Sequence, residues 1–289
     1  MHKTLPPTWR DWIADNLTRG CDPKSLIADM IRANFEPGFA SATVLGLAQT
    51  GIAPASSSAY VYETPRIAQG NLIRTPDRDV RVTLRMERPT IVFLDNVLSH
   101  DECDELVARS RDRLTRSTTV NPEDGKDAVI EARSSEGTFF PLNADEFIAK
   151  IDHRVAALMG MPVANGEGLQ ILHYHIGGQY TPHYDYFSPQ EPGSKPHIAN
   201  GGQRVSSLVM YLNHVEDGGA TVFPELGLQV GPKKGGAVYF EYCNSRGQLD
   251  QLSLHGGLPV LQGEKWIATK WMRERTYCQA TQNESMRPA

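Results

Sequence analysis

The part of the chain after residue 165 consists of short apolar runs separated by turns, and this pattern limits the possible folds more than any other feature. Segments containing Gly and Pro separate the runs. Runs of this length with turn residues between them predict the strands of an antiparallel sheet. The predicted strands are 169–174, 204–213, 220–223, 228–230, 236–242 and 265–272.

Helices and a few more strands are predicted before this region. Ser99 and Glu102 have the spacing of a capping box, which predicts a helix over about 99–114, and an apolar stripe predicts another helix over 145–159. Helices followed by many short strands predict an α+β fold with an antiparallel sandwich or barrel. A small barrel or jelly roll has a cavity at its mouth that suits a metal and an organic ligand. The additional strands are predicted at 80–86, 89–94 and 132–140.

The first 80 residues have a different character. Thr8 and Asp22 can cap two short helices, the second with Pro23 at its first position, and a third helix is predicted over 39–48. The apolar stripes of these helices are too small for an independent core, so we expect them to pack on the main domain or on a second subunit; contact with a substrate is an open alternative. The predicted organisation is a helical N-terminal extension (1–50), a Ser- and Pro-containing linker (51–79), a main domain (80–279) and a C-terminal tail (280–289).

Composition excludes some classes of function. The chain of 289 residues is 40% hydrophobic and 22% charged, which is ordinary for a globular protein. A formal charge of −5 gives no polyanion-binding signature, so nucleic acid is not an expected partner. No apolar run is long enough to span a membrane, and the first residues lack the apolar core of a signal peptide. The cysteines form no CxxC motif, so we expect them to be reduced and the location to be cytoplasmic; they are Cys21, Cys103, Cys243 and Cys278.

The pair His183 and Asp185 is the first candidate for chemistry. Two residues apart on a strand, the two side chains point to the same face. An imidazole and a carboxylate side by side make two-thirds of a facial metal site. Without further context, the pair is equally a turn histidine beside a strand-end aspartate. With nine His and 34 acidic residues, about one His-x-acid pair is expected by chance, so the motif needs support.

Two further His-x-acid pairs have structural interpretations. His100 and Glu102 lie at the start of the predicted capped helix, where Glu102 completes the capping box. His214 and Glu216 follow a predicted strand and precede a turn, so we interpret them as a solvated loop.

His255, which precedes two glycines, is the candidate third ligand. Two histidines and one carboxylate leave positions open on an octahedral metal and suit a non-haem Fe(II) that activates oxygen, whereas a closed zinc site would need a fourth ligand. Oxygen activation needs electrons, which a 2-oxo acid can supply while its distal carboxylate is held elsewhere. Lys265 is a cation placed for this role, because a buried lysine without a partner charge would be costly.

The order of motifs resembles the prolyl 4-hydroxylase family of Fe(II)/2-oxoglutarate dioxygenases. The motifs are FLDNVLSHDECDELV, RSSEGTFF, HxD, GQRV, MYLN, GGATVFP and HGG…GEKW…TKW, which span about 90–278. The resemblance does not cover the first 80 residues. It implies a double-stranded β-helix (a jelly-roll, cupin-like core) with supporting helices, which agrees with the predicted α+β fold.

The resemblance also implies site residues. They are iron ligands (His183, Asp185, His255), cosubstrate contacts (Lys265, Tyr174, Thr221) and residues lining the peptidyl-proline site (Tyr180, Arg204, Trp271), of which Tyr180 and Arg204 are the candidate catalytic residues. Structural alternatives stay open: the cosubstrate contacts Tyr174 and Thr221 can be ordinary strand residues, Trp271 a core residue, and Arg204 a salt-bridge partner. Tyr211 in MYLN faces the cosubstrate or simply packs, and we leave it outside the site.

The implied activity is hydroxylation of a prolyl residue in a peptide or protein. It would depend on Fe(II), 2-oxoglutarate and O2, with succinate and CO2 as co-products and ascorbate as a candidate reductant. The alternatives are a hydroxylase of free proline, another amino acid or a small peptide, and a non-catalytic metal-binding or sensing module. Because Asp185 is present, hydroxylation is favoured over halogenation, which needs that metal position for halide. The Pro- and Gly-rich segment 188–203 is either a lid or a surface loop, and a homodimer is an open alternative.

Overall fold

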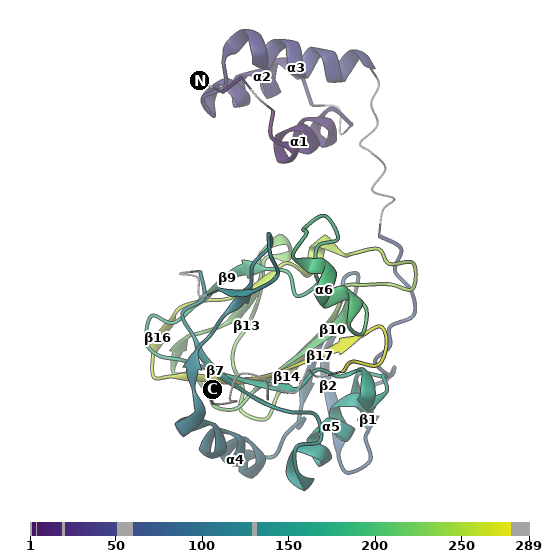
Figure 1. The fold of residues 1–289 in the computed structure, drawn as a ribbon, viewed down its shortest axis with the longest axis vertical. Helices are drawn as coiled ribbons and strands as arrows, with labels where there is room; N and C mark the ends of the chain where they lie inside the picture. Colours follow the sequence, from purple (N-terminus) through teal and green to yellow (C-terminus); the bar gives the residue numbers. More distant parts are fainter. Residues whose placement is uncertain (1, 4, 19–20, 51–59, 129–131, 279–289) are drawn as a thin grey trace, which may run out of the picture. The chain divides into compact units, whose positions relative to one another are not determined.

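The structure is a computed structural model that describes residues 2–3, 5–18, 21–50, 60–128 and 132–278. The chain forms two compact units, Met1–Val61 and Tyr62–Ala289, each of which is described by itself (Figure 1). The predicted C-terminal tail (280–289) and residues 51–59 of the predicted linker lie outside the described residues. No helix in the described part of the chain combines the length and the hydropathy needed to cross a bilayer.

The first unit contains the three predicted helices. They are α1 (Pro7–Thr18), α2 (Pro23–Arg32) and α3 (Pro37–Thr50). The Asp22 side chain caps α2 by accepting a hydrogen bond from the Lys24 amide at 3.1 Å, as predicted. The helices bury a small apolar cluster among themselves, made of Ile13, Leu26, Met30, Phe35, Ala40 and Val44. The helices therefore bury part of their apolar stripes against one another, and their packing on the main domain or on a second subunit stays a prediction.

The second unit is built on two antiparallel sheets. Among the described residues, the larger sheet has nine strands in the order β1 (Leu72–Arg74), β2 (Asp79–Glu87), β3 (Thr90–Asp95), β14 (Ala237–Glu241), β10 (Arg204–Tyr211), β17 (Lys265–Arg273), β8 (Leu169–Tyr174), β7 (Glu136–Phe140) and β4 (Thr115–Arg116). The smaller sheet has four: β13 (Leu228–Val230), β12 (Thr221–Phe223), β15 (His255–Gly257) and β9 (Tyr180–His183). This is the double-stranded β-helix that the resemblance implied, and it agrees with the antiparallel sandwich or barrel that the sequence pattern predicted.

Short elements complete the second unit. They are the strand pairs β5 (Thr119–Val120) with β6 (Asp127–Ala128) and β11 (Asp217–Gly218) with β16 (Val260–Gln262), and the helices α4 (His100–Ser110), α5 (Glu146–Leu158) and α6 (Ser194–Ala199). In Figure 1, α4 and α5 lie together on the side of the larger sheet that is away from the smaller sheet. The capping box of Ser99 and Glu102 at α4 is confirmed, because each side chain bonds the other residue's backbone amide.

The predicted linker is shorter in the structure. Strand β1, which lies within 51–79, pairs with β2, and Ile67 and Ile73 are buried in the core of the second unit. The alternation predicted for 80–86 is also imperfect, since Leu84 is 47% exposed. A register shift between Val82 and Leu84 interrupts the pleat at this point and leaves Leu84 facing solvent, whereas Met86 packs against the core again.

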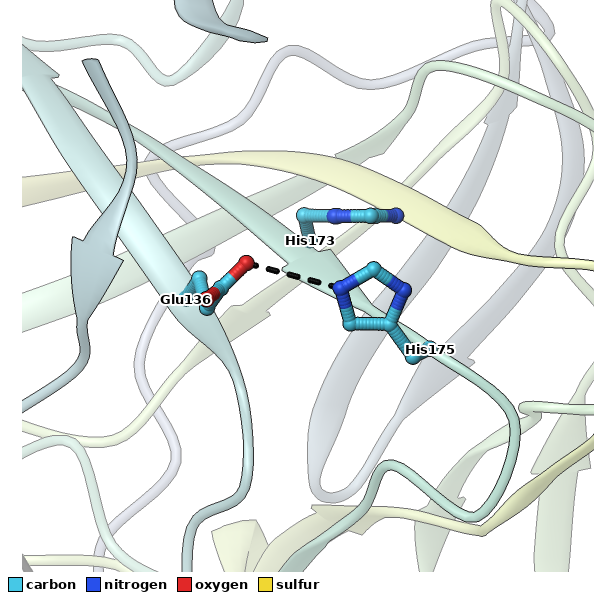
Figure 2. A group of neighbouring side chains, drawn as sticks. All are labelled: Glu136, His173 and His175. Atoms are coloured by element: carbon cyan, nitrogen blue, oxygen red, sulfur yellow. Dashed lines mark ion pairs between the residues drawn. The ribbon is translucent and has the colours of Figure 1, made fainter. Parts of the chain in front are cut away.

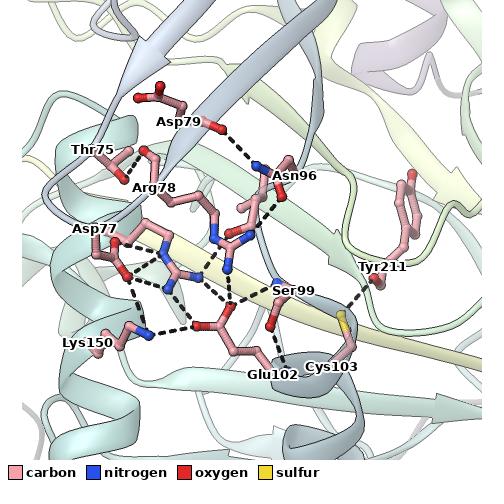
Figure 3. A network of polar contacts seen from close by, with 12 residues as sticks. Thr75, Asp77, Arg78, Asp79, Asn96, Ser99, Glu102, Cys103, Lys150 and Tyr211 are labelled. Carbon is pink, nitrogen blue, oxygen red and sulfur yellow. Dashed lines mark hydrogen bonds and ion pairs between the residues drawn. The ribbon is translucent and has the colours of Figure 1, made fainter.

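A buried ion-pair network attaches this same region to the helices. The Arg154 guanidinium of α5 donates to Asp77 (Nη2–Oδ2 2.5 Å) and to Glu102 of α4 (Nη1–Oε2 2.8 Å). Figure 3 shows Asp77 and Glu102 on opposite sides of the network, with Ser99 and Lys150 beside them. Burial raises the pKa of Glu102, but contacts led by the hydrogen bond from Arg154 outweigh this effect and lower the pKa to about 2. Residue 77 is thus a structural part of the second unit.

Truncation at two points tests the corrected boundary. Removing residues 1–61 is expected to leave a folded second unit, because the described side chains of that unit form a core of their own. Removing 1–78 also deletes Ile67, Ile73 and Asp77, leaving cavities and an under-paired Arg154. Losses of about 2–5 kcal/mol at each large buried residue predict a Tm lower by about 10 °C or more for the shorter protein. Thermal unfolding of the two proteins side by side checks this, and equal Tm values would contradict it.

Candidate active site

The three proposed iron ligands come together where β9 and β15 pair. His183 is the last residue of β9, His255 is the first of β15, and the two stand opposite each other in the register. The close approach of the strands depends on Gly256, where a Cβ atom would lie 2.9 Å from the Tyr180 carbonyl oxygen. Asp185 lies in a bend two residues after the end of β9. The expectation that His183 and Asp185 share one strand is therefore wrong, although the bend still brings the two side chains together.

Their orientations leave one nitrogen of each imidazole free for a metal. The Nδ1–H of His183 donates to the Thr181 carbonyl at 2.9 Å, and the Nδ1–H of His255 donates to the Ser253 carbonyl at 3.0 Å. Each Nε2 therefore carries a lone pair. The two Nε2 atoms each lie 3.6 Å from a different carboxylate oxygen of Asp185. One ligand atom from each residue lies within 4.8 Å of the other two, as a facial set of ligands requires.

The protonation states also suit a metal. Burial lowers the pKa of His255 to about 4, so this imidazole is neutral at pH 7. Burial alone would raise the pKa of Asp185, but the neighbouring His255, His183 and Arg204 outweigh it and hold the carboxyl well below its ordinary value. The Asp185 carboxylate accepts a hydrogen bond from the Ser207 hydroxyl at 2.5 Å, which fixes its direction. Two neutral imidazoles and one ionised carboxylate are the donor set that non-haem Fe(II) takes.

Lys265 lies in the same cavity without a partner charge. Its side chain is 3% exposed, and its ammonium forms no ion pair with any described carboxylate. Burial lowers its pKa to about 8. Lys265 stands opposite Tyr174 in the pairing of β17 with β8, and its ammonium lies 5.6 Å from the Tyr174 ring centroid. A buried cation without a counter-charge is costly, and binding an anion would lower that cost.

The proposed hydrogen-bonding residues lie near this lysine. Tyr174 and Thr221 are 4% exposed and both line the cavity. Burial raises the pKa of Tyr174, so its hydroxyl stays a donor. Tyr211, which we left outside the site, donates its hydroxyl hydrogen to Thr221 Oγ1 at 2.9 Å and does not line the cavity. It orients Thr221 and belongs to the layer behind the site.

The residues assigned to the substrate side form an aromatic and cationic wall. The Tyr180 ring stacks on His183 with centroids 3.6 Å apart. The Arg204 guanidinium lies 3.9 Å from the Trp271 ring centroid. It also forms a two-point ion pair with Glu167, at 2.6 and 2.8 Å. This pairing supports the salt-bridge interpretation of Arg204, and it holds the guanidinium against the tryptophan at the same time.

All nine predicted site residues line one open cavity of about 1020 Å³. The segment 188–203 contributes Glu191, Ser194 and His197 to its wall. This segment contains helix α6, and its Gly193 amide bonds the Pro122 carbonyl at 2.8 Å. The cavity is larger than a cosubstrate of a few atoms needs, so it has room for a second organic molecule.

Sequence reasoning missed three residues that support the site. Arg133 lies 4.9 Å from the Tyr180 ring centroid and donates to the Gln170 side chain at 3.2 Å. Glu167 holds Arg204, and Ser207 holds Asp185. Arg133 is the first residue of the motif RSSEGTFF, and Ser207 lies between the motifs GQRV and MYLN, so the resemblance is the one signal that could have found them.

Comparison with known proteins agrees with this geometry. A family model described as the 2OG-Fe(II) oxygenase superfamily matches residues 169–273. Probable prolyl 4-hydroxylase 3 of Arabidopsis thaliana is 38% identical over 208 residues, covering 65% of this chain and 71% of that protein. Prolyl 4-hydroxylase 5 of the same plant is 40% identical over 202 residues, covering 63% of this chain and 68% of that protein.

A solved structure is similar in both fold and sequence. It is the viral collagen prolyl hydroxylase vCPH of Paramecium Bursaria Chlorella virus-1, solved as a 2OG complex, which superposes with a TM-score of 0.51 at 30% identity. The similarity covers 63% of this chain and 95% of the viral one. Together with the two-histidine, one-carboxylate set and the unpaired buried lysine, these similarities show that the chain belongs to the prolyl 4-hydroxylase family of 2-oxoglutarate-dependent Fe(II) dioxygenases.

Proposed function

We propose that this chain hydroxylates prolyl residues of a peptide or protein, using Fe(II), 2-oxoglutarate and O2. The observation that carries the proposal is the position of Lys265. It is a buried cation without a partner charge, in the same cavity as His183, Asp185 and His255. A 2-oxo diacid can bind a metal through its keto-acid end and a cation through its distal carboxylate. One such molecule would therefore bind at both the metal ligands and Lys265.

His183, Asp185 and His255 would hold the iron. Bound iron, together with 2-oxoglutarate and O2, supplies the oxidation of the substrate C–H bond, with succinate and CO2 as co-products. The protein fixes the ligands in advance: backbone carbonyls orient both imidazoles, and the Ser207 hydroxyl orients the carboxylate. Such ordering lowers the cost of binding the metal and keeps its ligands in one geometry.

Lys265 would hold the distal carboxylate of 2-oxoglutarate. The Tyr174 and Thr221 hydroxyls lie on the same wall and can donate to the same anion. Tyr211 sets the direction of Thr221 through its hydrogen bond. The buried position of these groups excludes water, which strengthens each polar contact.

The substrate would bind against the aromatic wall. Tyr180 and Trp271 present ring faces to the cavity, and the rigid, apolar ring of proline suits such surfaces. The Trp271 indole N–H is buried without a hydrogen-bond partner among the described residues, so it is available to a substrate carbonyl. The names of the similar proteins, prolyl 4-hydroxylases and a collagen prolyl hydroxylase, support peptidyl proline as the substrate class.

A peptide panel tests the proposed substrate. The full chain is incubated with Fe(II), 2-oxoglutarate, O2 and proline-containing peptides, with and without ascorbate, and the products are analysed by mass spectrometry. The expected result is a gain of one oxygen on a proline with an equal amount of succinate. Matched peptides with alanine for proline are the control. Hydroxylation of free proline but of no peptide would replace this proposal with a free amino acid hydroxylase.

The pKa of Lys265 predicts how 2-oxoglutarate binding depends on pH. The ammonium form attracts the carboxylate, and this form is complete below the pKa of about 8. Affinity is therefore expected to be constant from pH 6 to about 7.5 and to fall above pH 8, by up to about tenfold per pH unit. Binding isotherms of metal-loaded protein at pH 7 and pH 9 check this. Lys265→Ala is the control, because its weaker affinity should not change between these pH values.

A further inference from the structure

A second group of metal-ligating side chains lies on the opposite face of the larger sheet. We call Glu136, His173 and His175 the outer-face cluster. Tyr174 points into the active-site cavity, so its neighbours His173 and His175 point to the other side of β8. Glu136 of β7 stands opposite His173 in the strand register. Figure 2 shows the three side chains gathered together, with the Glu136 carboxylate directed at His175.

His173 has an unsatisfied nitrogen. The residue is 5% exposed, and its Nε2–H donates to the Glu264 carboxylate at 2.7 Å. Its Nδ1 is buried and has no hydrogen-bond partner among the described residues. In a neutral imidazole this second nitrogen carries a lone pair. A buried acceptor without a partner is costly, so its presence needs an explanation.

The contact with Glu264 is typical of a histidine that binds a metal. Metal-ligating histidines commonly donate their other ring N–H to a carboxylate, which fixes the ring and makes the ligand nitrogen more basic. The ring is also fixed by Trp266, which stacks on it with centroids 4.0 Å apart. Thus His173 is held in place on one side, and its Nδ1 is left available on the other.

The remaining two residues of the cluster can close around an ion. One ligand atom from each member lies within 4.8 Å of the others, and His175 Nε2 is 3.5 Å from Glu136 Oε2. Ligands at about 2.0–2.2 Å from a tetrahedral ion are about 3.3 Å apart, so the His175–Glu136 separation already fits. The side chains of His175 and Glu136 are 69% and 43% exposed, so neither is locked in the core and both can adjust around an ion.

We propose that the outer-face cluster binds a second divalent transition-metal ion of the Zn²⁺ class. Two imidazoles and one carboxylate suit Zn²⁺, Cu²⁺ and Ni²⁺, and water can complete the coordination. The site is separate from the proposed iron site, because the proposed iron ligands line the cavity that Tyr174 faces, whereas none of the three residues of the outer-face cluster lines it. It does not depend on the proposed hydroxylation. An ion bound by the outer-face cluster would link Glu136 of β7 to the end of β8.

Zn²⁺ stoichiometry tests the proposal. The full chain and its variants are dialysed to equilibrium against micromolar Zn²⁺, and bound metal is measured by atomic absorption. The wild-type chain is expected to bind two ions, one at each site. His175→Ala and His183→Ala are each expected to bind one, and the double variant none. His175 is the residue to change because it is exposed, whereas loss of the buried His173 would also disturb the fold.

A matched control and an affinity measurement complete the test. His153→Ala removes an exposed histidine of α5 that is outside both clusters, and it is expected to bind two ions. In the His183→Ala background, competition with a chromophoric chelator should show affinity lowered about 10- to 100-fold by Glu264→Gln, the residue that orients His173. Equal Zn²⁺ stoichiometry in the wild-type chain and His175→Ala would overturn the outer site. If only the proposed iron site failed to bind Zn²⁺, His183→Ala would instead bind as many ions as the wild-type chain.

Discussion

Replacing Asp185 with alanine is expected to abolish hydroxylation. Asp185 is the only carboxylate among the three proposed iron ligands, and both histidine Nε2 atoms lie 3.6 Å from it. Its removal leaves two neutral imidazoles, which bind Fe(II) weakly and do not fix its position. Because the metal accounts for several kcal/mol of the rate enhancement, turnover should fall by at least about 10³-fold. Succinate release and Fe(II) binding, measured on the same preparation, check both parts of the prediction.

A second His-x-acid pair in the chain provides the control. His214 and Glu216 have the same spacing as His183 and Asp185, but His214 and Glu216 are both exposed in a loop after β10. His214→Ala and Glu216→Ala are therefore expected to retain activity and metal content. Full activity in Asp185→Ala would exclude it as an iron ligand, whatever the controls show. Thermal unfolding of each variant separates loss of the metal from loss of the fold.

Much of the fold was predictable because its core strands are buried on both faces. The bounds predicted for β8 match the structure, where all six of its residues are buried and turn residues follow its end. Strand β1 was missed because only Ile73 of its three residues is buried, so it carries no pattern of its own. Helix α6 was missed because it is six residues long and contains Pro196, which indicates a loop when read locally.

The site was predictable only in part from spacing. His183 and Asp185 could be paired from their separation, although the strand was expected to continue through both residues. His255 lies 72 residues after His183, so the residues offered it only as a candidate third ligand, and the resemblance then supported it. The register of β15 with β9 shows why the two histidines meet. Spacing alone could not have found Glu167 or Ser207, because their importance comes from contacts with Arg204 and Asp185, which are distant from them in the sequence.

The outer-face cluster illustrates the same limit. His173 and His175 form a His-x-His pair, but a sequence does not show that Glu136 stands opposite or that Glu264 completes the group. Strand pairing brings these distant residues together, and strand pairing depends on the whole fold. The alternation of β8 then separates the two metal sites: its cavity-facing residues include Tyr174, and His173 faces the other side.

Lys265→Ala is expected to weaken 2-oxoglutarate binding without harming the fold. Burial of this unpaired ammonium lowers its pKa from 10.5 to about 8, which corresponds to a cost of about 3 kcal/mol at pH 7 in the protein without an anion. Alanine removes that cost, so the Tm should be unchanged or higher. The same change removes the partner of a desolvated carboxylate, worth about 2–5 kcal/mol, so the apparent affinity for 2-oxoglutarate should fall at least about 30-fold.

Lys270 is the matched control for this prediction, because it lies on the same strand and is equally buried. Its ammonium donates to Asp152 at 2.7 Å, and both residues are 1% exposed. Lys270→Ala leaves Asp152 buried and unpaired, so stability should fall by about 3–5 kcal/mol while the affinity for 2-oxoglutarate stays the same. Lys265→Arg should restore little affinity, since the longer planar guanidinium would place its charge at a different point in the cavity from that of the lysine ammonium. Unchanged 2-oxoglutarate affinity in Lys265→Ala would place the carboxylate elsewhere in the cavity.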